Sequence, residues 1–159
     1  MTRFGDLLAA LAGAQVDFVV IGGVALITRG GSRLTNDLDV VYERSAQNLE
    51  RLVKAIGPLH PRLRGAPAGL PFFFDERSLR SGLNFALVTD LGELDLLGEV
   101  TGLGAYDQVL ALSSVVSLFG HDVQVLNLEG LERSKRAAGS AKDLIDLELI
   151  AAVRKATRT

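Results

Sequence analysis

Apolar and polar positions along the chain follow two different periods, and each period predicts a different kind of element. Apolar residues three or four positions apart predict helices over residues 4–14, 24–29, 46–56, 106–112, 128–138 and 141–157. Short apolar runs and period-two alternation predict strands over residues 17–21, 38–42, 83–88, 93–97, 115–118 and 123–126. The mixed order of these elements predicts an α/β (α+β) fold, with a small mixed β-sheet and helices packed against it.

Cap and turn residues support several of these boundaries. Ser45 and Ser140 carry hydroxyls that can cap a helix N-terminus, and they precede the helices predicted over 46–56 and 141–157. Residues 89–92 and the pair Gly120-His121 predict hairpin turns. We expect the helices over about 127–157 to pack on the core of a single domain spanning 1–159. The core-facing stripe expected for the last helix consists of Leu144, Ile145, Leu147, Leu149 and Ile150.

Residues 57–71 interrupt this regular pattern. The segment holds all four prolines of the chain, together with Arg62 and Arg64. Because proline lacks a backbone N–H and fixes its own φ, the segment predicts an irregular connection, either a plain surface loop or a mobile lid. The three phenylalanines at 72–74 predict an anchor that ties the end of this segment to the core.

Two carboxylates stand at the start of the strand predicted over 38–42. Side chains alternate across a strand, so Asp37 and Asp39 point to one face while Leu38 and Val40 point to the other. The two carboxylates would lie roughly 6–7 Å apart, which is two residues of strand rise. Repulsion at this distance raises a pKa or recruits a cation, and Mg²⁺ prefers carboxylate and phosphate oxygens. The alternative is a pair of solvated aspartates on an edge strand.

A glycine pair precedes these carboxylates at the end of another predicted strand. Gly22 and Gly23 follow the run 17–21 and lead into a predicted helix. Without β-carbons, they let backbone N–H groups approach a phosphate at a helix N-terminus. The alternative is a tight strand-to-helix turn with no ligand. Neither G-x-G-x-x-G nor G-x-x-x-x-G-K-[ST] occurs in the chain, so the sequence gives no support for a Rossmann or P-loop site.

A third acidic position lies on the strand predicted over 93–97. Leu94 and Leu96 face one way, whereas Glu93 and Asp95 face the other. An acidic side chain between leucines indicates a face that meets water or a cation. If this strand pairs beside the strand of Asp37 and Asp39, Asp95 completes a three-carboxylate site. Glu93 is a second candidate on the same face, although a solvated strand position is the favoured interpretation for it.

These features together resemble the signature of the DNA polymerase β-like nucleotidyltransferase superfamily. The spacing G-G-x-A-x₄-G-x₂-R-x-T-x-D-x-D is similar to that of a small bacterial branch that includes abortive-infection type II toxin-like nucleotidyltransferases. The later stretch KRAAGSAKDLIDL resembles the family block K-R-A-A-G-R-x-K-D-x-x-D-L, with Ser140 where a basic residue is expected. The matching residues are Gly22, Gly23, Gly30, Arg33, Thr35, Asp37, Asp39, Lys135, Arg136, Lys142, Asp143 and Asp146.

The resemblance implies a nucleotidyltransferase fold and the Mg²⁺-dependent transfer of a nucleoside monophosphate from a nucleoside triphosphate to a hydroxyl. It implies that Asp37, Asp39 and Asp95 are catalytic and hold one or two Mg²⁺ ions. It also implies nucleotide-binding roles, with the β- and γ-phosphates seated by the two glycines and Arg33, and pyrophosphate charge balanced by two lysines. Those nucleotide-binding residues are Gly22, Gly23, Arg33, Lys135 and Lys142.

Without the resemblance, some of these residues are also explained by purely structural roles. Arg33 is also explained as a turn residue paired to Asp37. Lys142 and Asp146 are four apart on one helical face, so they are also explained as an exposed ion pair.

Composition and charge limit the kinds of partner that the chain is expected to bind. With 159 residues and 48% hydrophobic residues, the chain is long enough for one core. The net charge of −2 argues against broad DNA binding, while residues 131–159 carry seven basic side chains against four acidic ones. The chain has no cysteine and no apolar run of about 18 residues, so we expect no membrane association and a cytoplasmic location. Phe4, Leu7, Leu8 and Leu11 favour an amphipathic helix over a signal peptide.

The sequence does not identify the acceptor. Relatives in the resembled branch modify RNA ends or partner proteins, and others modify small hydroxylated compounds, so an RNA, a protein or a small molecule is expected, in a toxin-like role or otherwise. The alternative function is a catalytically silent nucleotide-binding or toxin–antitoxin interaction module that keeps the fold.

Overall fold

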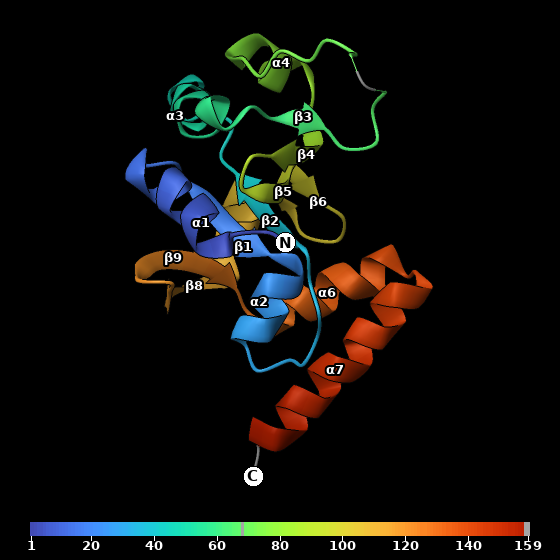
Figure 1. The fold of residues 1–159 in the computed structure, drawn as a ribbon. Coiled ribbons are helices and arrows are strands. Elements are labelled where there is room, and N and C mark those ends of the chain that lie inside the picture. Colours follow the sequence, from blue (N-terminus) through green and yellow to red (C-terminus); the bar gives the residue numbers. More distant parts are fainter. Residues whose placement is uncertain (68, 158–159) are drawn as a thin grey trace.

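The computed structural model describes residues 1–67 and 69–157, which are organised around a seven-stranded mixed sheet (Figure 1). Its strands lie in the order β3-β4-β5-β2-β1-β9-β8, and two further short strands form a separate hairpin. β1 is parallel to β9 and β2 is parallel to β5, whereas the other neighbours are antiparallel. The bounds are β1 Phe18–Ile21, β2 Asp37–Tyr42, β3 Arg62–Leu63, β4 Asn84–Thr89, β5 Gly92–Leu97, β6 Glu99–Val100, β7 Gly104–Ala105, β8 Ser113–Leu118 and β9 His121–Leu126.

Seven α-helices and one 3₁₀ turn are present in the described part of the chain. They are α1 Phe4–Gly13, α2 Gly22–Thr28, α3 Ala46–Ile56, the 3₁₀ turn Gly57–Leu59, α4 Glu76–Ser81, α5 Tyr106–Ala111, α6 Leu128–Ala138 and α7 Ala141–Thr157. The predicted α/β class is confirmed, and α3, α6 and α7 have the predicted bounds. Ser45 and Ser140 cap α3 and α7 as predicted, because their hydroxyls accept hydrogen bonds from the backbone N–H groups of Asn48 and Asp143. Within residues 1–67 and 69–157, no helix is long and apolar enough to span a lipid bilayer.

The central strands are buried at the middle of the sheet. All four residues of β1 are buried, and Leu38 and Val40 of β2 are fully inaccessible. Asp37 and Asp39 alternate with them and are only partly buried. The alternation of β2 therefore places its apolar side chains in the core and its two carboxylates on the opposite face.

The structure changes the interpretation of residues 57–71. This segment contains the 3₁₀ turn and β3, which pairs with β4 at the edge of the sheet. A strand of two residues among prolines gives no periodic signal, so the sequence could not indicate it. The expected phenylalanine anchor is partly wrong, because Phe72 and Phe74 pack against the core while Phe73 is 72% exposed.

The apolar stripe predicted for α7 is partly wrong, although Ile150 is buried and Leu149 packs against the core as predicted. Leu144 and Ile145 are 58% and 59% exposed, and the buried side of the helix carries Asp143, Asp146, Ile150 and Val153. Figure 1 shows α7 beside α6 and extending away from the sheet. The periodicity failed here because two acidic side chains on the buried side are paired with cations from other elements.

Candidate active site

Three predicted carboxylates meet where β2 and β5 run side by side. The parallel register places Asp39 opposite Asp95 and Asp37 opposite Glu93. Residues paired in register point to the same face of a sheet, so the acidic side chains share one face. One carboxylate oxygen from each of Asp37, Asp39 and Asp95 lies within 4.8 Å of the others, which is the spacing of a possible metal site. Glu93 lies on the same face but outside this triad.

Asp39 is the most perturbed of the three. Burial, a hydrogen bond with Asp95 and the negative charges of Asp95 and Asp37 together raise the pKa of Asp39 to about 8, although Lys135 opposes this. Its Oδ1 atom is buried and has no hydrogen-bond partner among the described residues. A buried carboxylate oxygen without a donor is costly unless a proton or cation satisfies it.

The glycine pair shapes the wall beside Asp39. Gly22 begins α2 with a φ of 67°, and a β-carbon there would overlap the Asp39 carboxylate. A β-carbon on Gly23 would lie 2.8 Å from Oγ1 of Thr35. Two elements far apart in sequence therefore approach closely only because these positions lack side chains. The helix begins at Gly22, two residues earlier than predicted.

The predicted basic residues gather on the other side of the triad. Arg33 Nη1 lies 2.6 Å from Asp146 Oδ2, and Lys135 Nζ lies 3.1 Å from the same oxygen and 3.4 Å from Asp143 Oδ1. Asp146 is only 1% exposed. Arg33 is thus bonded to Asp146 rather than to Asp37, and Asp146 is paired with Arg33 and Lys135 rather than with Lys142.

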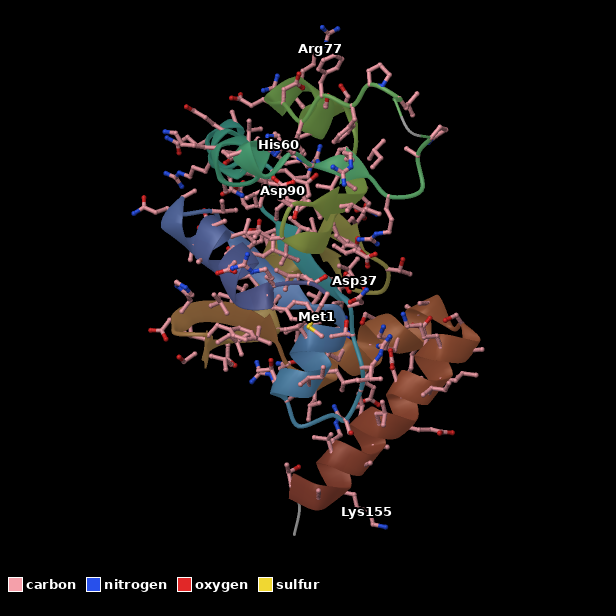
Figure 2. All side chains as sticks on the ribbon, viewed as in Figure 1. Met1, Asp37, His60, Arg77, Asp90 and Lys155 are labelled. Carbon is pink, nitrogen blue, oxygen red and sulfur yellow. The ribbon has the colours of Figure 1, made fainter. Side chains whose placement is uncertain are left out.

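A small polar cavity of about 120 Å³ joins these groups to the carboxylates. Figure 2 labels Asp37, which lines this cavity, near the C-terminal helices, while Lys155 lies toward the far end of α7. All five predicted nucleotide-binding residues line it. They are Gly22, Gly23, Arg33, Lys135 and Lys142.

A larger cavity of about 470 Å³ is lined by Asp39 and Asp95. Phe85, Leu97 and Val100 contribute apolar surface, and Glu99 and Asp143 contribute carboxylates. Lys135 lines both cavities, so the two spaces meet beside the acidic triad.

Ser140, which stands where a basic residue is expected, has a structural role. Its hydroxyl and backbone N–H donate to Asp143 Oδ2 while its Oγ accepts from the Asp143 N–H, and these bonds begin α7. Hydrogen bonding from Ser140, aided by Lys135, holds the pKa of Asp143 below its ordinary value. The Ser140 hydroxyl therefore fixes the position of the Asp143 carboxylate, which contacts Lys135.

Arg64 is the residue at this site that sequence reasoning missed. Its Nη2 lies 2.8 Å from Asp95 Oδ1, its Nε 3.7 Å from Glu93 Oε1 and its Nη1 4.0 Å from Asp37 Oδ2. The residue follows β3, which no sequence pattern indicated. Its only signal was a basic side chain in the segment interpreted as a loop or lid.

Comparison with solved structures identifies the fold. The chain is similar to ANT(2″)-Ia in complex with adenylyl-2″-tobramycin, with a TM-score of 0.59 and 14% identity over 98% of this chain and 94% of that one. It is also similar to the lincosamide antibiotic adenylyltransferase LnuA with lincomycin bound, with a TM-score of 0.59 and 11% identity over 96% and 98% of the two chains. A proposed nucleotidyltransferase from Thermotoga maritima gives a TM-score of 0.52 and 14% identity over 99% and 96%. No protein family model and no curated sequence matches the chain.

Proposed function

Because the chain has the nucleotidyltransferase fold, we propose that it is a Mg²⁺-dependent nucleotidyltransferase that moves a nucleoside monophosphate from a nucleoside triphosphate to a hydroxyl. The convergence of Asp37, Asp39 and Asp95 beside Gly22 carries this proposal. The polymerase β-like signature supports it independently, because the sequence motif does not depend on the geometry of the site.

The carboxylates fit a hard divalent cation. Three acidic oxygens lie within 4.8 Å of one another, and Asp39 Oδ1 is buried without a donor in the described structure. Mg²⁺ prefers such oxygen ligands and retains waters that phosphate oxygens can replace. When bound, it would neutralise charge on the phosphates during transfer. Asp37 and Asp39 would hold it, with Asp95 completing the acidic wall.

The small polar cavity is the proposed site for the triphosphate. The N-terminus of α2 lies at Gly22 and Gly23, and Lys142 is an exposed cation on the cavity wall. Lys135 faces both cavities, so it is placed to balance the charge that builds on the leaving pyrophosphate. Arg33 would contribute positive charge to the phosphate site while it remains paired with Asp146.

The proposed transfer needs one nucleophile and one base. The acceptor oxygen forms a bond to the α-phosphorus, and the bond from that phosphorus to the bridging oxygen breaks. Pyrophosphate leaves with the electron pair, and the hydroxyl proton passes to the Asp95 carboxylate. Holding the acceptor in line with the leaving oxygen supplies the orientation that the reaction requires.

The larger cavity favours a small acceptor. Its volume of about 470 Å³ is within the range of small-molecule sites, and it opens directly on Asp39 and Asp95. Its apolar wall and the carboxylates of Glu99 and Asp143 suit a hydroxylated compound with amino groups, and they disfavour a polyanion such as RNA. The similar structures contain adenylyl-2″-tobramycin and lincomycin, which points the same way.

The toxin-like assignment rests only on the sequence motifs. It would require an RNA end or a partner protein as acceptor, in place of a small molecule. A panel that contains aminoglycosides, lincosamides, transfer RNA and unmodified RNA therefore separates these functions.

A silent nucleotide-binding or toxin–antitoxin module is the second candidate. One observation favours it, namely that Arg33 and Lys135 are already paired with Asp146 and Asp143 and so have less charge to offer a phosphate. In that case the protein would bind nucleoside triphosphates without releasing pyrophosphate.

The test is pyrophosphate release from each nucleoside triphosphate, with and without Mg²⁺, across the acceptor panel. The proposal expects Mg²⁺-dependent release with at least one acceptor and its loss in Asp39→Asn. Asp90→Asn is the matched control, because Asp90 is exposed and paired with His60 away from the triad. Nucleotide binding without release for any acceptor would favour the silent module.

A further inference from the structure

Arg64 follows β3 and is linked to the triad by a row of residues on three neighbouring strands, β4, β5 and β2. The backbone N–H of Arg64 donates to the Ala86 carbonyl at 2.9 Å, and Ala86 is in register with Asp95, which is in register with Asp39. In-register residues share a face of the sheet. The side chain between Arg64 and Asp95 is only the methyl group of Ala86, which leaves the guanidinium room to extend over β4.

The guanidinium is fixed in this position by the sheet as well as by charge. Its Nη2 donates a hydrogen bond to the Leu87 carbonyl at 2.9 Å, and the side chain is 28% exposed. The same Nη2 lies 2.8 Å from Asp95 Oδ1. Because Arg64 is hydrogen-bonded to the backbone of β4, its position does not depend only on the carboxylates of the triad.

Arg64 compensates only part of the acidic cluster. Its contacts reach Asp95, Glu93 and Asp37, at 2.8, 3.7 and 4.0 Å. No ion pair reaches Asp39 among the described residues, and Asp39 Oδ1 is buried without a donor. Asp95 Oδ1 is likewise buried without a hydrogen-bond partner in the described structure, but Arg64 Nη2 lies 2.8 Å from it. Arg64 therefore places a cation nearest to Asp95, with Asp37 at the limit of its reach and Asp39 outside it.

We propose that the Arg64 guanidinium stands in place of a second divalent ion, so that the acidic site takes one Mg²⁺, held by Asp37 and Asp39. The inference rests on the proposed function, since it assigns the cations of that same site. A second divalent ion beside Asp95 would lie against a fixed positive charge, and like charges at such distances repel strongly in a partly buried site. Arg64 is thus a positioning residue that sets the number of metal ions.

Mn²⁺ alone, titrated into the nucleotide-free protein and followed by the electron paramagnetic resonance signal of the free ion, tests this inference. We expect one Mn²⁺ per wild-type chain and a second one in Arg64→Gln, with the binding of that second ion strengthened by about tenfold or more because the repelling charge is gone. Arg62→Gln is the matched control. Arg62 is exposed on β3, two residues from Arg64, and no contact joins it to the triad within residues 1–67 and 69–157.

Arg64→Lys provides a second variant if the glutamine variant does not fold. It keeps a cation beside Asp95 and should therefore keep a single bound Mn²⁺. Two ions on the wild type, or one ion on Arg64→Gln, would overturn the inference while leaving the proposed function intact. No Mn²⁺ on any of the proteins would contradict both.

Discussion

Replacing Asp39 with asparagine should stabilise the metal-free protein while abolishing its response to Mg²⁺. The change keeps the shape of the side chain and removes a titratable group from a partly buried position. Burial and the charges of Asp95 and Asp37 raise the pKa of Asp39 to about 8, from an ordinary value of 3.8. One pKa unit corresponds to about 1.36 kcal/mol, so the raised pKa of Asp39 lowers the free energy of unfolding at pH 7 by at most about 4 kcal/mol, because the folded protein takes up a proton that the unfolded chain has lost.

We expect Asp39→Asn to raise the free energy of unfolding by about 1–3 kcal/mol at pH 7, because relaxation around the site recovers part of that cost. The folded protein binds the Asp39 proton more tightly than the unfolded chain does. The wild-type stability without metal should therefore fall as the pH rises from about 4 to about 8, and Asp39→Asn should remove this part of the pH dependence.

Urea unfolding in EDTA and in Mg²⁺, at several pH values, measures both effects. Asp90→Asn should change neither the pH dependence nor the Mg²⁺ response, because Asp90 is exposed and paired with His60. An Asp39→Asn protein that is less stable than the wild type in EDTA at pH 7, or that is still stabilised by Mg²⁺, would refute this reasoning about the site.

Four further predictions test separate parts of the site. Gly22→Ala should lower the free energy of unfolding by about 2–4 kcal/mol, because its φ of 67° and the overlap with Asp39 both oppose a β-carbon. Gly57→Ala is the control, because it has open space around it, and its free energy of unfolding in the same urea assay should stay within about 0.5 kcal/mol of the wild type. Asp146→Asn should cost about 2–4 kcal/mol by the same measurement, since Arg33 loses its buried partner and Lys135 keeps only Asp143. A neutral result would contradict the importance of this network. Mg²⁺ affinity measured by calorimetry should increase by up to about tenfold from pH 7 to pH 9, because the ion must displace the Asp39 proton, and a flat profile would argue that Asp39 is already ionised. Lys142→Gln should weaken MgATP binding several-fold without changing stability, because this exposed lysine lines the polar cavity, and unchanged affinity in a filter-binding assay would exclude it from the nucleotide site.

Local patterns were sufficient for most of the fold. The period-two alternation of β2 and β5 predicted which side chains would share a face, and the condition that these strands pair is met by the register of Asp39 with Asp95. Ser45 and Ser140 were recognised as caps because N-cap chemistry is local to a few residues.

The features that sequence reasoning missed depend on contacts between distant segments. Apolar residues on α7 predicted a core stripe, but its buried side carries Asp143 and Asp146 because Lys135 neutralises both. Arg64 belongs to a segment without periodicity, and only the pairing of β3 with β4 brings it over Ala86 to Asp95. Each of these ion pairs joins residues on different elements, and no spacing rule in a single sequence indicates them.

Transfer of label from a nucleoside triphosphate labelled at the α-phosphate tests the central claim most directly. With Mg²⁺ and an acceptor that carries hydroxyl and amino groups, the account predicts that the α-label moves to the acceptor and that pyrophosphate is released in equal amount. Transfer of a γ-label instead, release of inorganic phosphate, or α-label transfer that persists when Asp39 is replaced by asparagine would contradict it.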